Sequence, residues 1–337
     1  YYREDKAGQI LEEGINEAGA MCSWIAAATS YSTNNRIMVP FYIFYSMFGF
    51  QRVGDLAWAA GDIQTRGFLL GGTAGRTTLN GEGLQHQDGH SHLLSATIPN
   101  CVSYDPAFAH EVAVIVQHGL KRMMQDQENV WYYITLMNEN YAQPGLKKGQ
   151  EEGILRGIYR LREGPAGSGM GRSIPRVQLL GSGTILREAI AAAELLEADW
   201  GVSGDVWSVT SFTELRRDGI DVERWNLLHP GEKPRKAYIT QELERSAGPI
   251  VATTDYMRSF ADQIRPFIPR GRDYRVLGTD GFGRSDTRAR LREFFEVDRH
   301  YVVLSALRAL ADEGAVPPSK VAEAIRKYGI ETDRRNP

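Results

Sequence analysis

A single acidic residue, Glu17, stands in an unusual chemical setting. The 18 residues that follow it carry no charged side chain, and the apolar pattern predicts a helix over residues 9–29. On that helix the face of Glu17 continues with the apolar residues Met21 and Trp24. Because desolvation disfavours the charged form, a carboxyl group there either has a partner or retains its proton, and both suit proton transfer. The alternative is that Glu17 lies in a solvated turn of the helix.

Three histidines gather in the segment GEGLQHQDGHSH, residues 81–92. His86, His90 and His92 could ligate a metal, but their spacing straddles an Asp-Gly turn signal, unlike a helical pair of ligands. Imidazoles beside an acid, Glu82, equally suit a polar pocket in which they donate to an anion or shuttle protons. A third interpretation, a hydrogen-bonded structural loop, also stays open.

Two further motifs carry weaker signals. LLGSGT, residues 179–184, resembles part of a dinucleotide-binding fingerprint, yet Leu186 stands where a third small residue belongs. The helix that follows could bind an anion at its start, but a tight turn is the preferred interpretation. The aromatic run FYIFYSMFGF, residues 41–50, is typical of a core, and one or two of its rings could line a pocket for a flat heterocycle.

The segments that would position these residues alternate between strands and helices. Before residue 164, strands are predicted at 38–45, 67–70, 100–103 and 130–137, and helices at 9–29, 46–60 and 107–125. After residue 176, strands are predicted at 177–180, 205–211, 250–254 and 274–277, helices at 184–199 and from residues 255, 286, 301 and 319, and a mixed segment at 238–245. Buried strands that alternate with helices predict an α/β fold with parallel sheets in both halves.

A stretch rich in glycine, serine and proline, GPAGSGMGRSIP, divides the chain and has no hydrophobic periodicity. We therefore predict a first domain over residues 1–163, a linker over 164–176 and a second domain over 177–337. The length of 337 residues also fits two domains.

Composition narrows the class of protein. Apolar residues make up 42% and charged residues 24%, as in ordinary globular proteins. With 39 basic and 42 acidic side chains the net charge is −3, so no nucleic-acid partner is expected. Two cysteines are too few for a disulfide framework and fit a reducing compartment. No apolar stretch reaches the ~20 residues of a membrane span, and the beginning lacks a signal peptide, so we expect the later part of a longer polypeptide.

Several long motifs together resemble bacterial homodimeric pyruvate dehydrogenases, the thiamine-diphosphate enzymes of the pyruvate dehydrogenase complex. These motifs are EGINEAGA at 13–20, SYSTNN at 30–35, FYIFYSMFGFQR at 41–52, GGTAGRTTLNGEGLQHQDGHSH at 71–92 and LGTDGFGRSDTR at 277–288. The resemblance extends essentially from Tyr1 to Pro337. It implies two transketolase-like α/β domains, a pyrimidine-binding domain that is incomplete at its start and a transketolase-type carboxy-terminal domain.

The resemblance also implies roles for individual residues. Glu17 matches the glutamate that hydrogen-bonds the aminopyrimidine ring of thiamine diphosphate and shares a proton with it, which helps to create the ylide nucleophile. Phe48 matches the ring that stacks on the pyrimidine. Tyr45 and His86 match side chains that contact the substrate-derived adduct, and Glu82 matches an acid beside them.

Some residues and parts of the family pattern are left without a match. His90 lies near the substrate pocket, whereas the resemblance gives no role to His92 or to Gln87, where some relatives carry a glutamate. The GDG motif that helps these enzymes to hold the diphosphate and Mg²⁺ is absent from this sequence. The diphosphate and metal are therefore expected on an upstream domain, with the cofactor between the two subunits of a homodimer. The chain alone should carry half a site and be inactive.

The implied reaction is the decarboxylation of pyruvate and the reductive acetylation of the lipoyl group on dihydrolipoyl acetyltransferase. We expect it in the bacterial cytoplasm, without a nucleic-acid or membrane partner. Another thiamine enzyme, either a transketolase or a dehydrogenase for a different 2-oxo acid, is an alternative. An isolated fragment that acts only in dimerisation or docking is a second alternative, and the metal-binding histidine loop is a third.

Overall fold

The first half of the chain is built on a parallel sheet of four strands. The computed structural model describes residues 3–166 and 174–337. The strands pair in parallel in the order β1-β2-β4-β3. Their bounds are Phe41–Tyr45 for β1, Phe68–Gly72 for β2, Cys101–Tyr104 for β3 and Trp131–Thr135 for β4.

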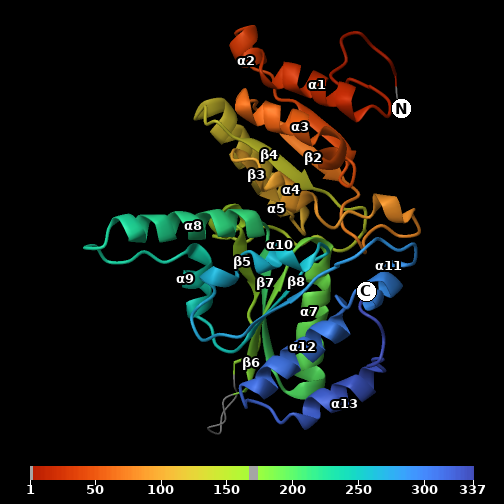
Figure 1. The fold of residues 1–337 in the computed structure, drawn as a ribbon, viewed down its shortest axis with the longest axis vertical. Helices are drawn as coiled ribbons and strands as arrows, with labels where there is room; N and C mark the ends of the chain where they lie inside the picture. The colour runs from red at the N-terminus through yellow and green to blue at the C-terminus, as the bar shows by residue number, and fades with distance from the viewer. Residues whose placement is uncertain (1–2, 167–173) are drawn as a thin grey trace.

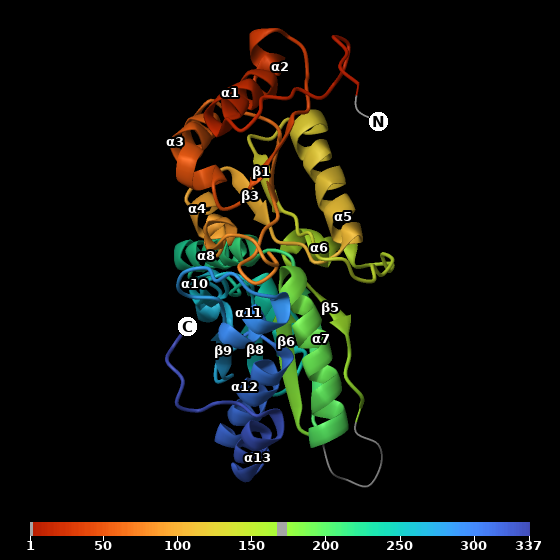
Figure 2. The same cartoon turned by 90° about the vertical axis from the view of Figure 1, so that its right-hand side faces the viewer.

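Helices cover both faces of this sheet, and Figure 2 shows α3 and α5 on its two sides. Successive side chains of a strand point to opposite faces. Trp131 and Tyr133 of β4 therefore pack under α1 and α3, whereas Tyr132 and Ile134 pack against α5. The helices are α1 Glu17–Ala28, α2 Ser30–Thr33, α3 Gly49–Asp62, the 3-10 turn η1 Leu84–His86, α4 Ser91–Ser95, α5 Ala109–Leu120 with a π-helical turn over Lys121–Gln125, and α6 Glu151–Arg156.

Strand β1 forms an open edge of this sheet. Every second side chain, at Phe41, Ile43 and Tyr45, is exposed, with exposed fractions of 47%, 67% and 47%. Phe44, between them in sequence, is buried under α1 and α3. One face of β1 is thus part of the core while the other presents large apolar side chains to solvent.

The second half is built on a five-stranded sheet in the order β5-β7-β6-β8-β9, parallel except for β5. Helices α7 and α12 cover one face, and α8, α9 and α10 cover the other (Figures 1 and 2). The strands are β5 Ile158–Arg162, β6 Arg176–Gly181, β7 Ser203–Val209, β8 Ile250–Thr253 and β9 Tyr274–Leu277. The helices are η3 Gly183–Ile185, α7 Leu186–Leu195 with a π-helical turn over Leu196–Trp200, α8 Phe212–Leu228, α9 Tyr238–Glu244, α10 Arg258–Asp262, η5 Arg265–Phe267, α11 Arg288–Phe294, α12 Arg299–Asp312 and α13 Ser319–Tyr328.

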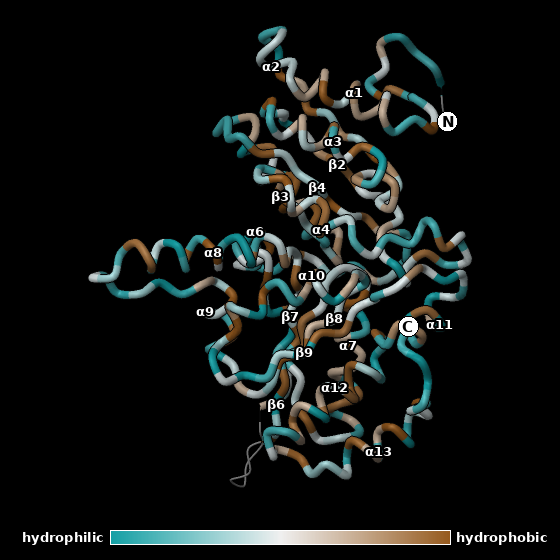
Figure 3. The backbone as a smooth tube through the Cα atoms, in the orientation of Figure 1, coloured by the Kyte–Doolittle hydropathy of each residue, from teal (hydrophilic) through white to brown (hydrophobic). Residues whose placement is uncertain are grey.

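Hydropathy follows this layering. Figure 3 shows hydrophobic segments concentrated in the strands of the second sheet and in α12, whereas the protruding arm formed by α8 is mainly hydrophilic. No helix in the described parts of the chain is both long enough and apolar enough to cross a membrane.

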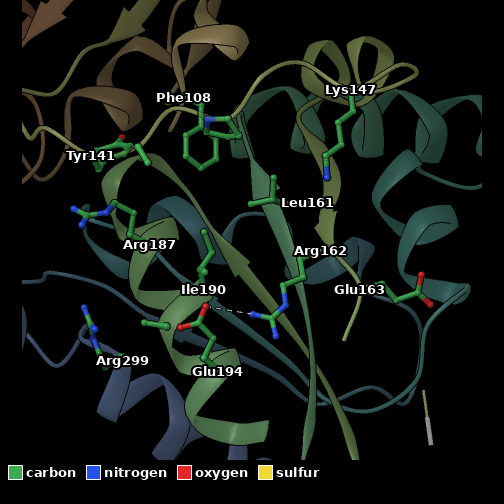
Figure 4. Close-up of a pocket in the computed structure, with 13 residues that line it drawn as sticks. Phe108, Tyr141, Lys147, Leu161, Arg162, Glu163, Arg187, Ile190, Glu194 and Arg299 are labelled. Carbon is green, nitrogen blue, oxygen red and sulfur yellow. Dashed lines mark ion pairs between the residues drawn. The ribbon is translucent and has the colours of Figure 1, made fainter. Parts of the chain in front are cut away.

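Buried polar contacts join the two halves. The Asp105 amide donates to the Thr210 carbonyl oxygen at 2.8 Å, which links β3 to the end of β7. Asp255, fully buried after β8, accepts from the hydroxyl groups of Thr77 and Thr78 at 2.7 Å each. Burial raises the pKa of the Asp105 carboxyl to about 7. The interface between the halves therefore combines buried hydrogen bonds with apolar contacts, among them that of Phe108 of the first half with core residues of α7 (Figure 4).

The structure confirms the predicted α/β fold and differs from the prediction in some elements. The first helix begins at Glu17 rather than at residue 9, because the Asn16 side chain caps it by accepting from the Gly19 amide at 3.1 Å. Helix α8 was not predicted, although Ser211 caps it in the same way by accepting from the Glu214 amide. The segment at 238–245 is the helix α9.

The position of the domain boundary stays a proposal. Strand β5 falls inside the predicted first domain, 1–163, yet it pairs with β7 of the second sheet. We therefore propose a boundary ahead of β5, between α6 and Ile158. Residues 167–173 of the predicted linker, 164–176, lie outside the described residues.

Candidate active site

Three aromatic rings meet beside the carboxyl ends of β1 and β2. Tyr45 is the last residue of β1, Phe48 follows it in the turn before α3, and His86 lies in the loop after β2. The His86 ring centroid is 5.1 Å from those of both Tyr45 and Phe48, and Tyr45 and Phe48 are 6.3 Å apart. Because parallel strands end at the same edge of a sheet, residues far apart in sequence converge there, where α/β proteins bind ligands.

Glu17 is joined to this aromatic cluster through an arginine. Its Oε1 lies 2.7 Å from Nη1 of Arg52, and the guanidinium of Arg52 lies 4.2 Å from the centroid of the Phe48 ring. The Glu17 side chain is 16% exposed, so it does not lie in an open solvated turn. Glu17 also acts on its surroundings, because burial, together with the charges of Glu17 and Glu13, raises the pKa of Tyr42 to about 12.

His86 retains an unsatisfied ring nitrogen. Its Nδ1 is buried and has no hydrogen-bond partner among the described residues. The nearest carboxylate oxygen, Oε2 of Glu82, is 3.7 Å away, which is an ion-pair distance but too long for a hydrogen bond. A buried polar atom that lacks a partner is costly unless a ligand or water completes it. This nitrogen is therefore the clearest sign that the aromatic cluster faces a binding site.

The other two histidines have separate surroundings. His90 hydrogen-bonds Gln51 of α3 through its Nε2. His92 is fully buried, where its ring nitrogens lie 2.6 Å from the Ser103 hydroxyl and 2.9 Å from the Thr135 hydroxyl. Burial lowers the pKa of His92 to about 3, so this imidazole is neutral.

The histidine loop therefore does not assemble a metal centre. In residues 3–166 and 174–337, no three His, Cys, Asp or Glu side chains come together in a way that could hold a metal ion. His92 belongs to the buried hydrogen-bond network, as the structural interpretation of this segment expects. His86 lies at the aromatic cluster, where its role in a polar pocket stays a prediction.

Sequence reasoning missed Arg52. A signal was present, because Arg36 and Arg52 are the only charged residues between positions 18 and 54, and either could have paired with Glu17. The one-turn spacing of Phe48 and Arg52 also places the guanidinium over the ring. Arg52 therefore belongs to the candidate site.

The LLGSGT motif, residues 179–184, forms a tight turn between a strand and a helix, which was the preferred interpretation of its sequence. Strand β6 ends at Gly181, Gly183 has φ of 50°, and α7 begins at Leu186. The Thr184 hydroxyl lies 2.6 Å from the Thr78 hydroxyl of the first half. The start of this helical segment is thus packed against the first domain.

The chain has the transketolase-like fold. Solved transketolase structures share the fold: a structure titled "Split gene transketolase, inactive beta4 tetramer" has a TM-score of 0.60 at 17% identity, covering 88% of this chain and 83% of that chain. Transketolase from Leishmania mexicana has a TM-score of 0.62 at 15% identity, with coverage of 88% and 37%.

Sequence comparison identifies the family. Residues 1–144 match the family model for the pyruvate dehydrogenase E1 component middle domain, and residues 157–298 match that for the transketolase-like C-terminal domain. The pyruvate dehydrogenase E1 components of Pseudomonas aeruginosa and Escherichia coli K12 are 64% and 63% identical across all of this chain. The chain belongs to the pyruvate dehydrogenase E1 component family, and it spans 38% and 37% of the length of these two relatives.

Proposed function

We propose that this chain supplies the pyrimidine-binding side of the active site of a thiamine-diphosphate-dependent pyruvate dehydrogenase. The whole protein would decarboxylate pyruvate and reductively acetylate the lipoyl group of dihydrolipoyl acetyltransferase. The observation that carries the proposal is the meeting of Tyr45, Phe48 and His86, with Glu17 reached through Arg52. The names of the relatives support pyruvate as the substrate.

The residues fit the aminopyrimidine end of the cofactor. Phe48 offers an aromatic face, Glu17 offers a sheltered carboxylate, and His86 offers the partnerless Nδ1. Bound thiamine diphosphate supplies a thiazolium carbon that acts as the nucleophile. Glu17 would hold a proton between its carboxylate and a pyrimidine ring nitrogen, and its second oxygen, Oε2, can do this while Oε1 accepts from Arg52.

The remaining residues would act on the substrate. Tyr45 and His86 would orient the carboxylate and carbonyl oxygens of pyruvate, and the charge of Glu82 at 3.7 Å would favour the His86 tautomer that carries its proton on Nδ1. His90, held by Gln51, would border the pocket. We assign the diphosphate and Mg²⁺ to parts of the protein outside this chain, and we place the protein as a homodimer in the bacterial cytoplasm.

The decisive experiment compares the full-length protein with its Glu17→Gln variant. Pyruvate-dependent reduction of an artificial electron acceptor is measured with thiamine diphosphate and Mg²⁺. Loss of a positioned proton carrier should lower turnover by about 100-fold or more. Glu223→Gln, which neutralises an exposed carboxylate on α8, is the matched control and should keep full activity. Equal activity in both variants would refute the role of Glu17.

Substrate comparison separates pyruvate dehydrogenase from the other thiamine enzymes. Turnover of pyruvate should exceed that of 2-oxobutyrate and 2-oxoglutarate, and the opposite order would favour a different 2-oxo acid dehydrogenase. Transfer of a two-carbon ketol unit between sugar phosphates would favour a transketolase.

We also propose that the 337-residue chain alone has no catalytic activity. In the described residues no three His, Cys, Asp or Glu side chains come together to hold a metal ion, and the similar split-gene transketolase structure is titled as inactive. Tight binding of Mg²⁺ and thiamine diphosphate by the isolated chain, with decarboxylation of pyruvate, would refute this.

A further inference from the structure

The loop that carries Glu82 and His86 belongs to the first domain but is held by the second. At its start, Arg288 Nε donates to the Thr78 carbonyl oxygen at 2.7 Å. In its middle, the Gly81 amide donates to the Asp286 carbonyl oxygen at 3.2 Å, and at its end the Met257 amide donates to the Gly89 carbonyl oxygen at 2.9 Å. Residues of the second domain therefore fix this loop along its whole length.

Gln87, directly after His86, makes a further connection to the second domain, and this one is fully buried. Its side chain is fully buried, and its Oε1 accepts from the Arg284 amide at 2.6 Å. Its Nε2 donates to the Leu79 carbonyl oxygen at 3.3 Å. One amide group thus closes the loop on itself and attaches it to the second domain, which requires an acceptor and a donor on the same side chain.

The second domain also approaches this loop closely at Gly283. A Cβ atom added there would lie 2.5 Å from the Leu84 carbonyl oxygen and 2.7 Å from Oε1 of Gln87. Leu84 begins the 3-10 turn that ends with His86. Residues 283–284 therefore lie directly against the turn that sets the direction of the His86 side chain.

We propose that Gln87 is a positioning residue through which the second domain orients His86 toward Tyr45 and Phe48. The ring contacts of His86 lie within the first domain, while the side chain of the next residue, Gln87, accepts from the Arg284 amide of the second domain. The inference rests on the proposed role of His86 in binding substrate. It gives the carboxy-terminal domain a direct part in the geometry of the active site.

The test uses the full-length protein with Gln87→Leu, which has similar size but neither donor nor acceptor. A small displacement of His86 should lower kcat/KM for pyruvate by about 10- to 100-fold. Gln87→Glu keeps the acceptor for the Arg284 amide but loses the donor for the Leu79 carbonyl oxygen, so it should recover only part of this loss. The matched control, Gln85→Leu, changes an exposed residue of the same turn and should behave as wild type.

Amide hydrogen exchange of residues 79–88 gives a readout that does not depend on activity. Exchange there should rise in Gln87→Leu and stay unchanged in Gln85→Leu. Increased exchange in a protein that is inactive toward pyruvate would support the positioning contact while refuting the proposed function. Unchanged exchange and kinetics in Gln87→Leu would overturn the inference. If that variant fails to fold, Gly283→Ala tests the same contact and should give the same local rise in exchange.

Discussion

Arg292 of α11 links the two domains through a buried network of charges. Its guanidinium is 6% exposed and contacts both Glu139, from the segment after β4, and Glu188 of α7, which is 5% exposed. Burial alone would raise the pKa of Glu188, but hydrogen bonds and charges from Arg299 and Arg292 outweigh it and hold the pKa below its usual value. We predict that Arg292→Met destabilises the chain strongly, because two buried carboxylates lose their shared cation.

The magnitude follows from what remains after the substitution. Removing one partner of a buried ion pair typically costs 3–5 kcal/mol. Glu139 keeps Arg187 and Glu188 keeps Arg299, so the lower end, about 3 kcal/mol, is expected. For a chain of 337 residues that corresponds to a fall in Tm of roughly 4 °C.

The assay is urea unfolding of the 337-residue chain with and without the substitution. Arg290→Met on the same helix is the control, since its pair with Glu293 is exposed on both sides and should contribute at most about 1 kcal/mol. Because Glu188 has a lowered folded-state pKa, its contribution is present above about pH 4.5 and is lost as the pH falls through the folded value. The difference between wild type and Arg292→Met should therefore shrink in acid. Equal effects of the two substitutions near neutral pH would refute the reasoning.

Three other predictions concern backbone strain, pH and thiol chemistry. Gly248 has φ of 83°, and an added Cβ would overlap a carbonyl oxygen of β6, whereas Gly314 has φ of 73° and open space around it. Gly248→Ala should therefore lower the unfolding free energy at least twice as much as Gly314→Ala, and equal losses would contradict this. His92 stays neutral in the folded state down to about pH 3, whereas in the unfolded state it binds a proton below about pH 6.5. Between these pH values the folded state binds fewer protons, so the stability of the protein should rise with pH. Urea unfolding of His92→Gln should show a flatter profile there, and profiles parallel to wild type would argue against it. In the folded protein a thiol reagent should label the exposed Cys22 but not the buried Cys101, because burial raises the pKa of the Cys101 thiol. Cys101 should react only after unfolding, and labelling of the folded Cys22→Ser variant would disprove this.

Local sequence patterns predicted the sheets but not which loop residues would meet. Tyr45 and His86 are far apart in sequence, and their rings converge only because β1 and β2 are parallel neighbours that end at the same edge. The family resemblance, rather than periodicity, placed them in one site. The partner of Glu17 had to await the structure, because Arg36 and Arg52 both satisfied the charge pattern.

The features that were missed depend on long-range contacts. Helix α8 has many charged residues and an internal glycine, Gly219, and both weaken the sequence pattern that predicts a helix. The glycine is explained by the ring of Phe267, which packs where a Cβ atom of residue 219 would lie. His92 entered the core because the hydroxyl groups of Ser103 and Thr135, on adjacent strands, satisfy its ring nitrogens. Gln87 gained meaning only through its contact with Arg284, which no local pattern encodes.

Under the proposed function, the open edge at β1 would connect catalysis with assembly. Tyr45 belongs both to the exposed apolar row of β1 and to the aromatic cluster. A polypeptide that covered the whole row, Phe41, Ile43 and Tyr45, would also cover one side of the cluster and help to exclude solvent from it. Association of the polypeptides and exclusion of water from the active site would then occur together. Specific activity would therefore rise with protein concentration and fall on dilution.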